Sequence, residues 1–340
     1  PQRYRFRSMI LLKLFKNDRA AGTGVMVLLL IGIFLPSFIL DFGAGGPKEM
    51  SSCVSMPFYR LVFGAIHTLP VLNHFVAMGI IMLMSYLLIR IGVRDQLLQQ
   101  RSLMPAIFFI LFTAALPEAR QVSPALIGSL FYLLCFIILF EVHDKKPDTL
   151  SIFAASLILV LGSMFCLKLI WFVPLIWVSL WTIRPVTWRE LSYPVLAYLF
   201  LALLLFTWYW GIKDNGAGFT TLIKENMSFS GGFQALHYSV YLLYGFILLL
   251  VIIASIYMID RFQTMKTVVQ NTYQVMFYMF LAGILFFVFI ARFDPGSLVF
   301  IAFPVTFVLS NYFHRKRNPW THEVIMWILL GLVVYVQLMV

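Results

Sequence analysis

The chain of 340 residues is 61% hydrophobic and only 11% charged, and its formal net charge is +11. A soluble domain is about half apolar and a quarter charged, so these proportions exclude a soluble globular protein and indicate a chain dissolved in a bilayer. Lys and Arg collect in the cytoplasmic loops of membrane proteins, and this accounts for the positive charge better than nucleic-acid binding does.

The first 23 residues alternate between basic and apolar side chains, as in Arg5, Phe6, Lys13 and Leu14. This pattern predicts a basic amphipathic helix that lies on the cytoplasmic membrane surface. No small-residue cleavage site follows, so we interpret the first apolar run as a retained anchor. Residues 24–340 then form a single transmembrane domain.

Apolar runs separated by short polar segments fill the rest of the chain. The expected spans are residues 25–40, 71–89, 103–116, 124–142, 150–167, 169–183, 191–211, 237–258, 274–291, 297–311 and 322–340. Two longer outer segments, 41–70 and 212–236, interrupt them. The apolar part of the first, 56–66, is too short to cross and predicts an interfacial helix. We therefore expect an all-α bundle with about 11 spans.

The basic residues predict the orientation of this bundle. With the N-terminus inside and the C-terminus outside, 18 of the 25 Lys and Arg residues fall in cytoplasmic segments and 7 in outer segments. The opposite orientation would invert this bias, so N-in and C-out is the prediction. It depends on the short run at 103–116, because all later loops would change sides if that run did not cross.

The three cysteines, Cys53, Cys135 and Cys166, are odd in number and lack CxxC spacing. This argues against a metal site and against a disulfide framework. The chain also lacks HExxH, GxSxG, Walker A and GxGxxG motifs, so those classes of protease, hydrolase and nucleotide-binding site are not indicated.

Acidic residues avoid the middle of every expected span, which argues against an ion-coupled transporter with a midplane carboxylate. The candidates for chemistry therefore lie on the outer side. Asp41 stands where the first span ends, beside a glycine-rich turn. A carboxylate there could ligate a divalent cation or accept a proton from a sugar hydroxyl. The alternative is a polar residue that only ends the helix.

Glu118 and Arg120 share a very short outer loop between the third and fourth spans. Arg120 could bind a lipid-linked phosphate, and Glu118 a metal or an acceptor, or the two could form a simple surface ion pair. Arg60 on the interfacial helix and Lys168 at the tip of the hairpin between the fifth and sixth spans could also bind phosphate. Alternatively, both cations could extend toward lipid headgroups.

The order of these parts resembles the GT-C superfamily of polyprenol-dependent glycosyltransferases. The resemblance covers residues 24 to about 200. It rests on Asp41 after the first span, on an outer segment with a membrane-surface helix at 47–67, and on the short outer loop at 117–124. The layout, including Trp188-Arg189-Glu190, also resembles an uncharacterised family of bacterial polytopic proteins.

The resemblance implies an enzyme of the bacterial inner membrane that moves a sugar from a polyprenyl-phosphate carrier at the outer face. It implies these roles: Asp41 as base or metal ligand, Glu118 as assisting carboxylate, and Arg60, Arg120 and Lys168 as phosphate-binding groups. Two alternatives remain open. One is a non-catalytic membrane subunit of an envelope or secretion complex, and the other is a transporter of a lipid or small molecule.

Overall fold

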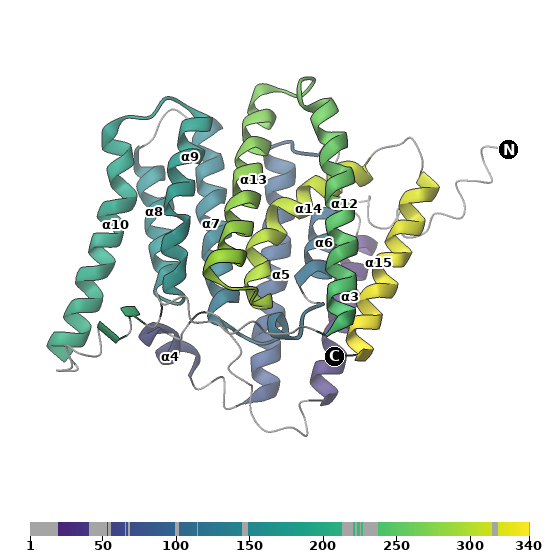
Figure 1. Cartoon of the computed structure of the whole chain (residues 1–340), viewed down its shortest axis with the longest axis horizontal. Coiled ribbons are helices and arrows are strands. Elements are labelled where there is room, and N and C mark those ends of the chain that lie inside the picture. Colours follow the sequence, from purple (N-terminus) through teal and green to yellow (C-terminus); the bar gives the residue numbers. More distant parts are fainter. Residues whose placement is uncertain are drawn as a thin grey trace.

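The computed structural model describes most of the chain, and all of the described residues that have regular structure are helical. It covers residues 20–40, 53, 56–64, 66, 69–98, 102–113, 115–144, 149–212, 220–221, 223–224, 226, 237–314 and 319–339. Within these residues there are twelve α-helices, most of them side by side in one bundle (Figure 1). The expected all-α class is confirmed.

The elements follow one another with short connections. They are α3 (Ala20–Leu40), α4 (Pro57–Phe63), α5 (Pro70–Arg94), α6 (Met104–Thr113), η2 (Pro117–Arg120), α7 (Pro124–Asp144), α8 (Thr149–Ser163), η3 (Leu167–Phe172), α9 (Val173–Ile183), α10 (Trp188–Thr207), η4 (Trp208–Ile212), α12 (Tyr238–Phe262), α13 (Thr267–Leu285), η5 (Phe286–Ile290), η6 (Pro295–Leu298), α14 (Val299–Phe313) and α15 (Pro319–Met339). The η2, η3 and η6 segments are 3-10 turns, and η4 and η5 are π-helical.

Proline begins many of these elements, including α4, α5, α7 and η6. Its missing N–H is no loss there, because the first N–H groups of a helix have no partner within the helix. The proline-rich outer segments of the sequence therefore mark where the chain turns back into the bundle.

Seven helices are long and apolar enough to cross a membrane. They are Pro70–Arg94, Pro124–Glu141, Trp188–Gly211, Tyr238–Phe262, Thr267–Ile290, Pro295–Phe313 and Trp320–Met339. Four shorter apolar helices fall on the remaining expected spans: Gly22–Phe38, Met104–Thr113, Leu150–Ser163 and Leu167–Ile183. The protein is thus a polytopic integral membrane protein. The count of 11 spans and the N-in, C-out orientation stay predictions.

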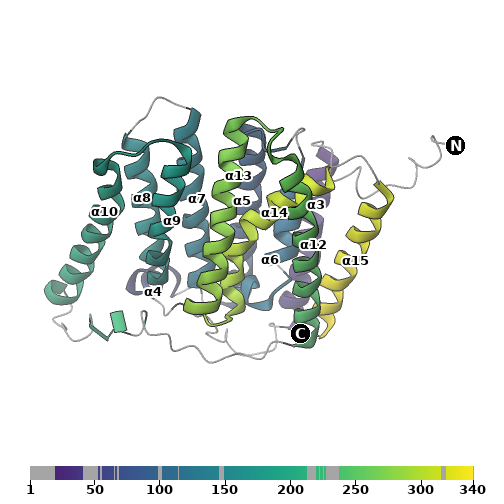
Figure 2. The same ribbon diagram turned by 45° about the horizontal axis from the view of Figure 1, so that its top comes forward.

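The two views of the bundle agree on how its ends are arranged (Figures 1 and 2). The end of α7, the beginning of α10 and the α12–α13 turn lie at one end, which we call the inner end after the predicted orientation. The short helix α4, the end of α13 and the end of α15 lie at the opposite, outer end. This alternation is the one that the sequence predicts.

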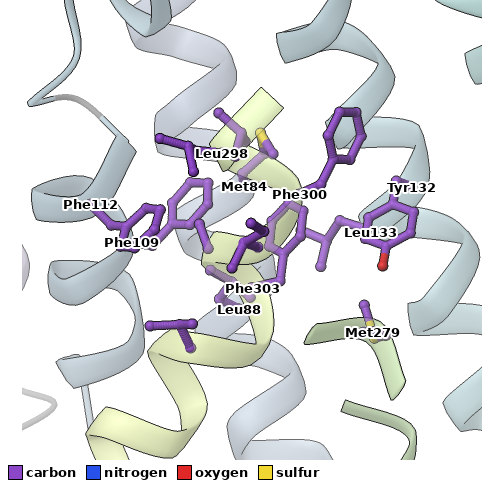
Figure 3. Packing of buried hydrophobic residues seen from close by; sticks show 14 of the residues in the cluster. Met84, Leu88, Phe109, Phe112, Tyr132, Leu133, Met279, Leu298, Phe300 and Phe303 are labelled. Carbon is purple, nitrogen blue, oxygen red and sulfur yellow. The ribbon is translucent and has the colours of Figure 1, made fainter. Parts of the chain in front are cut away.

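The core is built around α14, whose side chains are almost all buried (Figure 3). Phe303 of α14 stacks on Phe109 of α6 with ring centroids 5.3 Å apart, and Phe300 meets Tyr132 of α7 edge-on at 5.6 Å. All ten residues of α6 are buried too. At about 15 Å, α6 reaches halfway across a bilayer core, which is tolerated because protein rather than lipid surrounds it.

The helices at the edges of the bundle carry the lipid-facing residues. Both α10 and α15 lie at its flanks (Figure 1). Trp188 at the beginning of α10 is 87% exposed, and Trp320 at the beginning of α15 and Trp210 near the end of α10 are also exposed. Tryptophans at helix ends are typical of the two membrane interfaces.

At the inner end of the bundle, Arg94 forms ion pairs with Asp95 and Glu141.

Candidate functional site

The short outer loop that carries Glu118 and Arg120 is held by buried polar side chains from neighbouring helices. His74 of α5 donates from Nδ1 to the carbonyl oxygen of Arg120 at 2.7 Å. The N–H of Val122 donates to Oδ1 of Asn73 at 2.9 Å, and Tyr59 of α4 donates to the carbonyl oxygen of Val122 at 2.8 Å. Buried backbone groups need partners, so these bonds fix the path of the loop.

The side chain of Arg120 lies inside the protein, because the residue is only 6% exposed. Its guanidinium donates to Oγ of Ser37 and to the carbonyl oxygen of Ala115, both at 3.1 Å. Burial lowers the pKa of Arg120 to about 10, and the charge of Glu118 opposes this. The pKa remains above neutral pH, so Arg120 is a fixed, buried positive charge.

Glu118 is half-buried, and its Oε2 atom is buried without a hydrogen-bond partner among the described residues. Burial raises the pKa of this carboxyl above its ordinary value. A hydrogen bond with its own backbone and the charge of Arg120 lower the pKa, whereas the charge of Asp294 raises it further. A carboxylate in this environment is a stronger proton acceptor than an exposed one.

Asp294 is buried in the turn between α13 and α14, where the backbone is strained. Arg292 and Phe293 have φ angles of 48° and 64°, a left-handed conformation that costs about 1–2 kcal/mol for a residue other than glycine. The turn follows the π-helical segment η5, and both features recur at functional sites. Asp294 immediately precedes η6, and the hydroxyl of Ser297 donates to its carbonyl oxygen at 2.7 Å.

Lys168 joins these residues from η3. The sequence predicted a tight hairpin with Lys168 at its tip, but the connection between α8 and α9 runs through residues 164–172 and folds inward, so Lys168 is only 7% exposed. Its charge interacts with those of Asp294 and Arg292. Charges on three separate outer turns thus act on one another, and we call their residues, Glu118, Arg120, Lys168, Arg292 and Asp294, the outer charge cluster.

The structure brings only some of the predicted site residues into one group. Glu118, Arg120 and Lys168 are connected through Asp294, while Arg60 is exposed on α4. Asp41 lies outside the described residues. Sequence reasoning missed Asp294 and Arg292, although their turn combines opposite charges with a proline just as the Glu118 loop does. Within the described ranges, no three His, Cys, Asp or Glu side chains gather as a metal site would require.

The argument against disulfides was wrong for one pair of cysteines, because Cys53 and Cys166 form a disulfide with their Cα atoms 5.5 Å apart. The two residues are 113 positions apart, so no local spacing could indicate the pair. Cys135, buried in α7, is the unpaired third cysteine. Disulfides persist in oxidising compartments, which agrees with placing the outer end outside the cytoplasm.

Comparison with known proteins identifies the family. Residues 49–340 match a family described as a family of unknown function, DUF6427, and the chain belongs to it. Neither the curated proteins nor the solved structures contain a match. The family description states no activity, so any activity must be argued from the outer charge cluster.

Proposed function

We propose that this member of DUF6427 is an envelope protein of the bacterial inner membrane that binds a polyprenyl-phosphate-linked sugar and transfers the sugar at the outer face. The observation that carries the proposal is the outer charge cluster. The charges of two carboxylates and three cations from three different turns interact there, at the end of a bundle in which every acidic residue of the described ranges lies near a helix end or in a turn.

The cations suit the phosphate of a lipid carrier. Lys168 is buried, and burial of an ammonium group is unfavourable unless an anion accompanies it. Asp294 supplies part of that negative charge, but Arg292 beside it adds a second cation. A phosphate bound between Lys168 and Arg292 would balance the excess positive charge, and its polyprenyl chain would remain in the adjacent bilayer.

The carboxylates suit the transfer step. The acceptor hydroxyl would give its proton to a carboxylate, and the acceptor oxygen would bond to the anomeric carbon. The bond from that carbon to the phosphate oxygen would break, and polyprenyl phosphate would leave with the electron pair. Glu118, with its raised pKa, is the described candidate for the assisting carboxylate. Asp41 remains the sequence-based candidate for the base, with or without a divalent cation.

The binding part can be tested with purified protein in lipid nanodiscs. The probe is labelled polyprenyl phosphate, and polyprenol of the same chain length is the comparison. Lys168→Gln should weaken phosphate-dependent binding about tenfold, which corresponds to about 1.4 kcal/mol. Lys266→Gln is the matched control, because Lys266 lies at the inner end, where it donates to Gln96. Equal binding of both lipids by the unmodified protein would refute the proposal.

The transfer part needs a separate assay with a sugar-loaded carrier. Glu118→Gln and Asp41→Asn should each reduce the release of polyprenyl phosphate while leaving carrier binding largely intact. Unchanged release in both variants would exclude these carboxylates from the reaction.

One observation favours the alternative of a non-catalytic membrane subunit. The guanidinium of Arg120 donates to Ser37 and Ala115, so it stabilises the fold and has fewer donors for a ligand. On this alternative, the outer charge cluster stabilises the outer loops and binds no substrate. Phosphate-independent lipid binding, combined with a partner protein that co-purifies in fixed proportion, would support the subunit.

A further inference from the structure

We infer that α4 positions the residues of the outer charge cluster, and that it does so only when the Cys53–Cys166 disulfide, four residues before the helix, is formed. The inference rests on the proposed function only where it concerns lipid binding. The structural coupling that it describes stands on the contacts of α4, and these can be tested separately.

The disulfide joins α4 to the turn that carries Lys168. Cys166 immediately precedes η3, and its carbonyl oxygen accepts from the N–H of Leu169 at 3.1 Å. Lys168 is therefore only two residues from the sulfur bridge. Phe58 of α4 also packs edge-on against Phe165, with ring centroids 5.3 Å apart. The covalent bond and the aromatic contact together fix the beginning of η3.

The same segment joins the loop that carries Glu118 and Arg120. Tyr59 of α4 is buried and donates to the carbonyl oxygen of Val122, two residues beyond Arg120. One short helix thus contacts both turns that supply the predicted site residues. If α4 moves, it loosens the positions of Lys168 and Arg120 together.

Apart from the disulfide, a few side-chain contacts hold α4: the hydrogen bond of Tyr59 and the packing of Phe58 and Phe63 against Phe165. The helix has seven residues, and a helix of that length is unstable on its own. Only Tyr59 within it is buried, whereas Leu61 is 65% exposed and Val62 is exposed as well. The exposed apolar face suits the membrane surface, which keeps α4 at the outer interface but does not fix its position along that interface.

The bond requires an oxidant, and the chemistry specifies its class. The thiolate of one cysteine attacks a disulfide of a thiol-oxidising protein and forms a mixed disulfide. The thiolate of the second cysteine attacks that mixed disulfide, the Cys53–Cys166 bond forms, and the oxidant leaves as a dithiol. Two protons and two electrons have then passed from the cysteines. The oxidant that this step names is a protein disulfide on the outer side.

The test uses the full chain in nanodiscs, before and after reduction with a membrane-impermeant phosphine. Hydrogen exchange is followed in peptides that cover 57–63, 117–123 and 167–172. Reduction should speed exchange in all three, while peptides of α14 stay protected. Because both cysteines are buried, complete reduction is first checked by alkylating the free thiols. Unchanged exchange in 117–123 and 167–172 of the fully reduced protein would then overturn the inference whether or not any lipid binds.

Variants separate the tether from the fold. Cys53→Ser/Cys166→Ser should exchange like the reduced protein in either redox state, and Cys135→Ser should behave like the unmodified chain. Tyr59→Phe keeps the disulfide but removes the bond to Val122, so it should speed exchange in 117–123 alone. Polyprenyl phosphate should bind about tenfold more weakly after reduction, because the site is less preorganised. Equal affinity in both redox states would overturn the coupling to the site.

Discussion

The carbonyl oxygen of Arg120 accepts a hydrogen bond of 2.7 Å from Nδ1 of His74. Both residues are buried, and the bond joins the first turns of α5 to the loop that contributes two residues to the outer charge cluster. Because the acceptor is a carbonyl oxygen, Nδ1 must carry the proton, so the tautomer of His74 is determined by its partner.

We expect His74→Leu to lower the free energy of unfolding by about 1–3 kcal/mol, because a buried carbonyl oxygen loses a hydrogen bond. Thermal unfolding of the detergent-solubilised protein would measure the loss. His237→Leu is the comparison, since His237 is exposed and caps the beginning of α12 by bonding, within the described residues, to nearby Ser239. An unchanged Tm for His74→Leu would contradict the structural role of His74.

The sequence could not predict this bond. His74 stands at the beginning of an apolar run, where a polar residue ordinarily sits at the headgroup level. Its partner is 46 residues away and belongs to a loop. The run itself was predictable from hydropathy, since residues 71–89 were expected and α5 covers Pro70–Arg94. Hydropathy therefore finds the long helices but not the polar contacts that connect their ends.

The pH dependence of stability should report on Glu118. Folding raises the pKa of this carboxyl, so the folded protein holds the proton more tightly than the unfolded chain does. The stability that this provides is fully present below the ordinary pKa of 4.5 and is lost as pH rises through the folded pKa. Above the folded pKa the carboxylate is charged, and its burial then destabilises the fold.

Glu118→Gln should therefore raise the Tm at pH 8 and leave it unchanged at pH 4, where the protonated acid and the amide are alike. The same variant should reduce sugar transfer, because gain of stability with loss of activity is typical of a functional group held in an unfavourable environment. Glu141→Gln is the control: it breaks the ion pair with Arg94, so it should not raise the Tm at pH 8. A lower Tm for Glu118→Gln at pH 8 would refute this account.

The candidate site was partly predictable. Placing ionisable residues on the outer side selected Glu118, Arg120 and Lys168, because charges are tolerated at the membrane surface. Asp294 was missed because an acidic residue before proline at the beginning of a helix has an ordinary structural explanation. Its neighbours come from turns more than 120 residues earlier in the chain, and only the packing of α14 against α6 and α7 brings them together.

Close packing of α7 against α8 should be sensitive to a single methyl group. A Cβ added at Gly162 would lie 2.7 Å from Cβ of Phe131, which cannot move without its backbone. We expect Gly162→Ala to destabilise the protein by about 1–3 kcal/mol. Gly245→Ala is the matched control in α12, where an added Cβ has no atom within 4 Å. Thermal unfolding of the two variants side by side decides the matter, and equal Tm values would count against the packing.

The orientation and the crossing by α6 can be tested together. Lys266, after the α12–α13 turn, donates to the side chain of Gln96, before α6, at 3.0 Å. Two residues in contact are expected on the same side of the membrane, and the six expected spans between Gln96 and Lys266 agree with this, because six is an even number. Had α6 failed to cross, these residues would face opposite compartments.

The side of each position can be measured by adding single cysteines to a Cys135→Ser variant and treating intact cells with a membrane-impermeant maleimide. The Cys53–Cys166 pair does not react, because its two sulfur atoms are bonded to each other. Gln96→Cys and Thr264→Cys should label only after the membrane is opened, because both belong to the predicted inner end. Trp210→Cys, at the exposed outer end of α10, should label at once. If Gln96→Cys and Thr264→Cys label under different conditions, an odd number of segments crosses between them, and the predicted span count is wrong. If both label in intact cells while Trp210→Cys does not, the span count holds but the orientation is reversed.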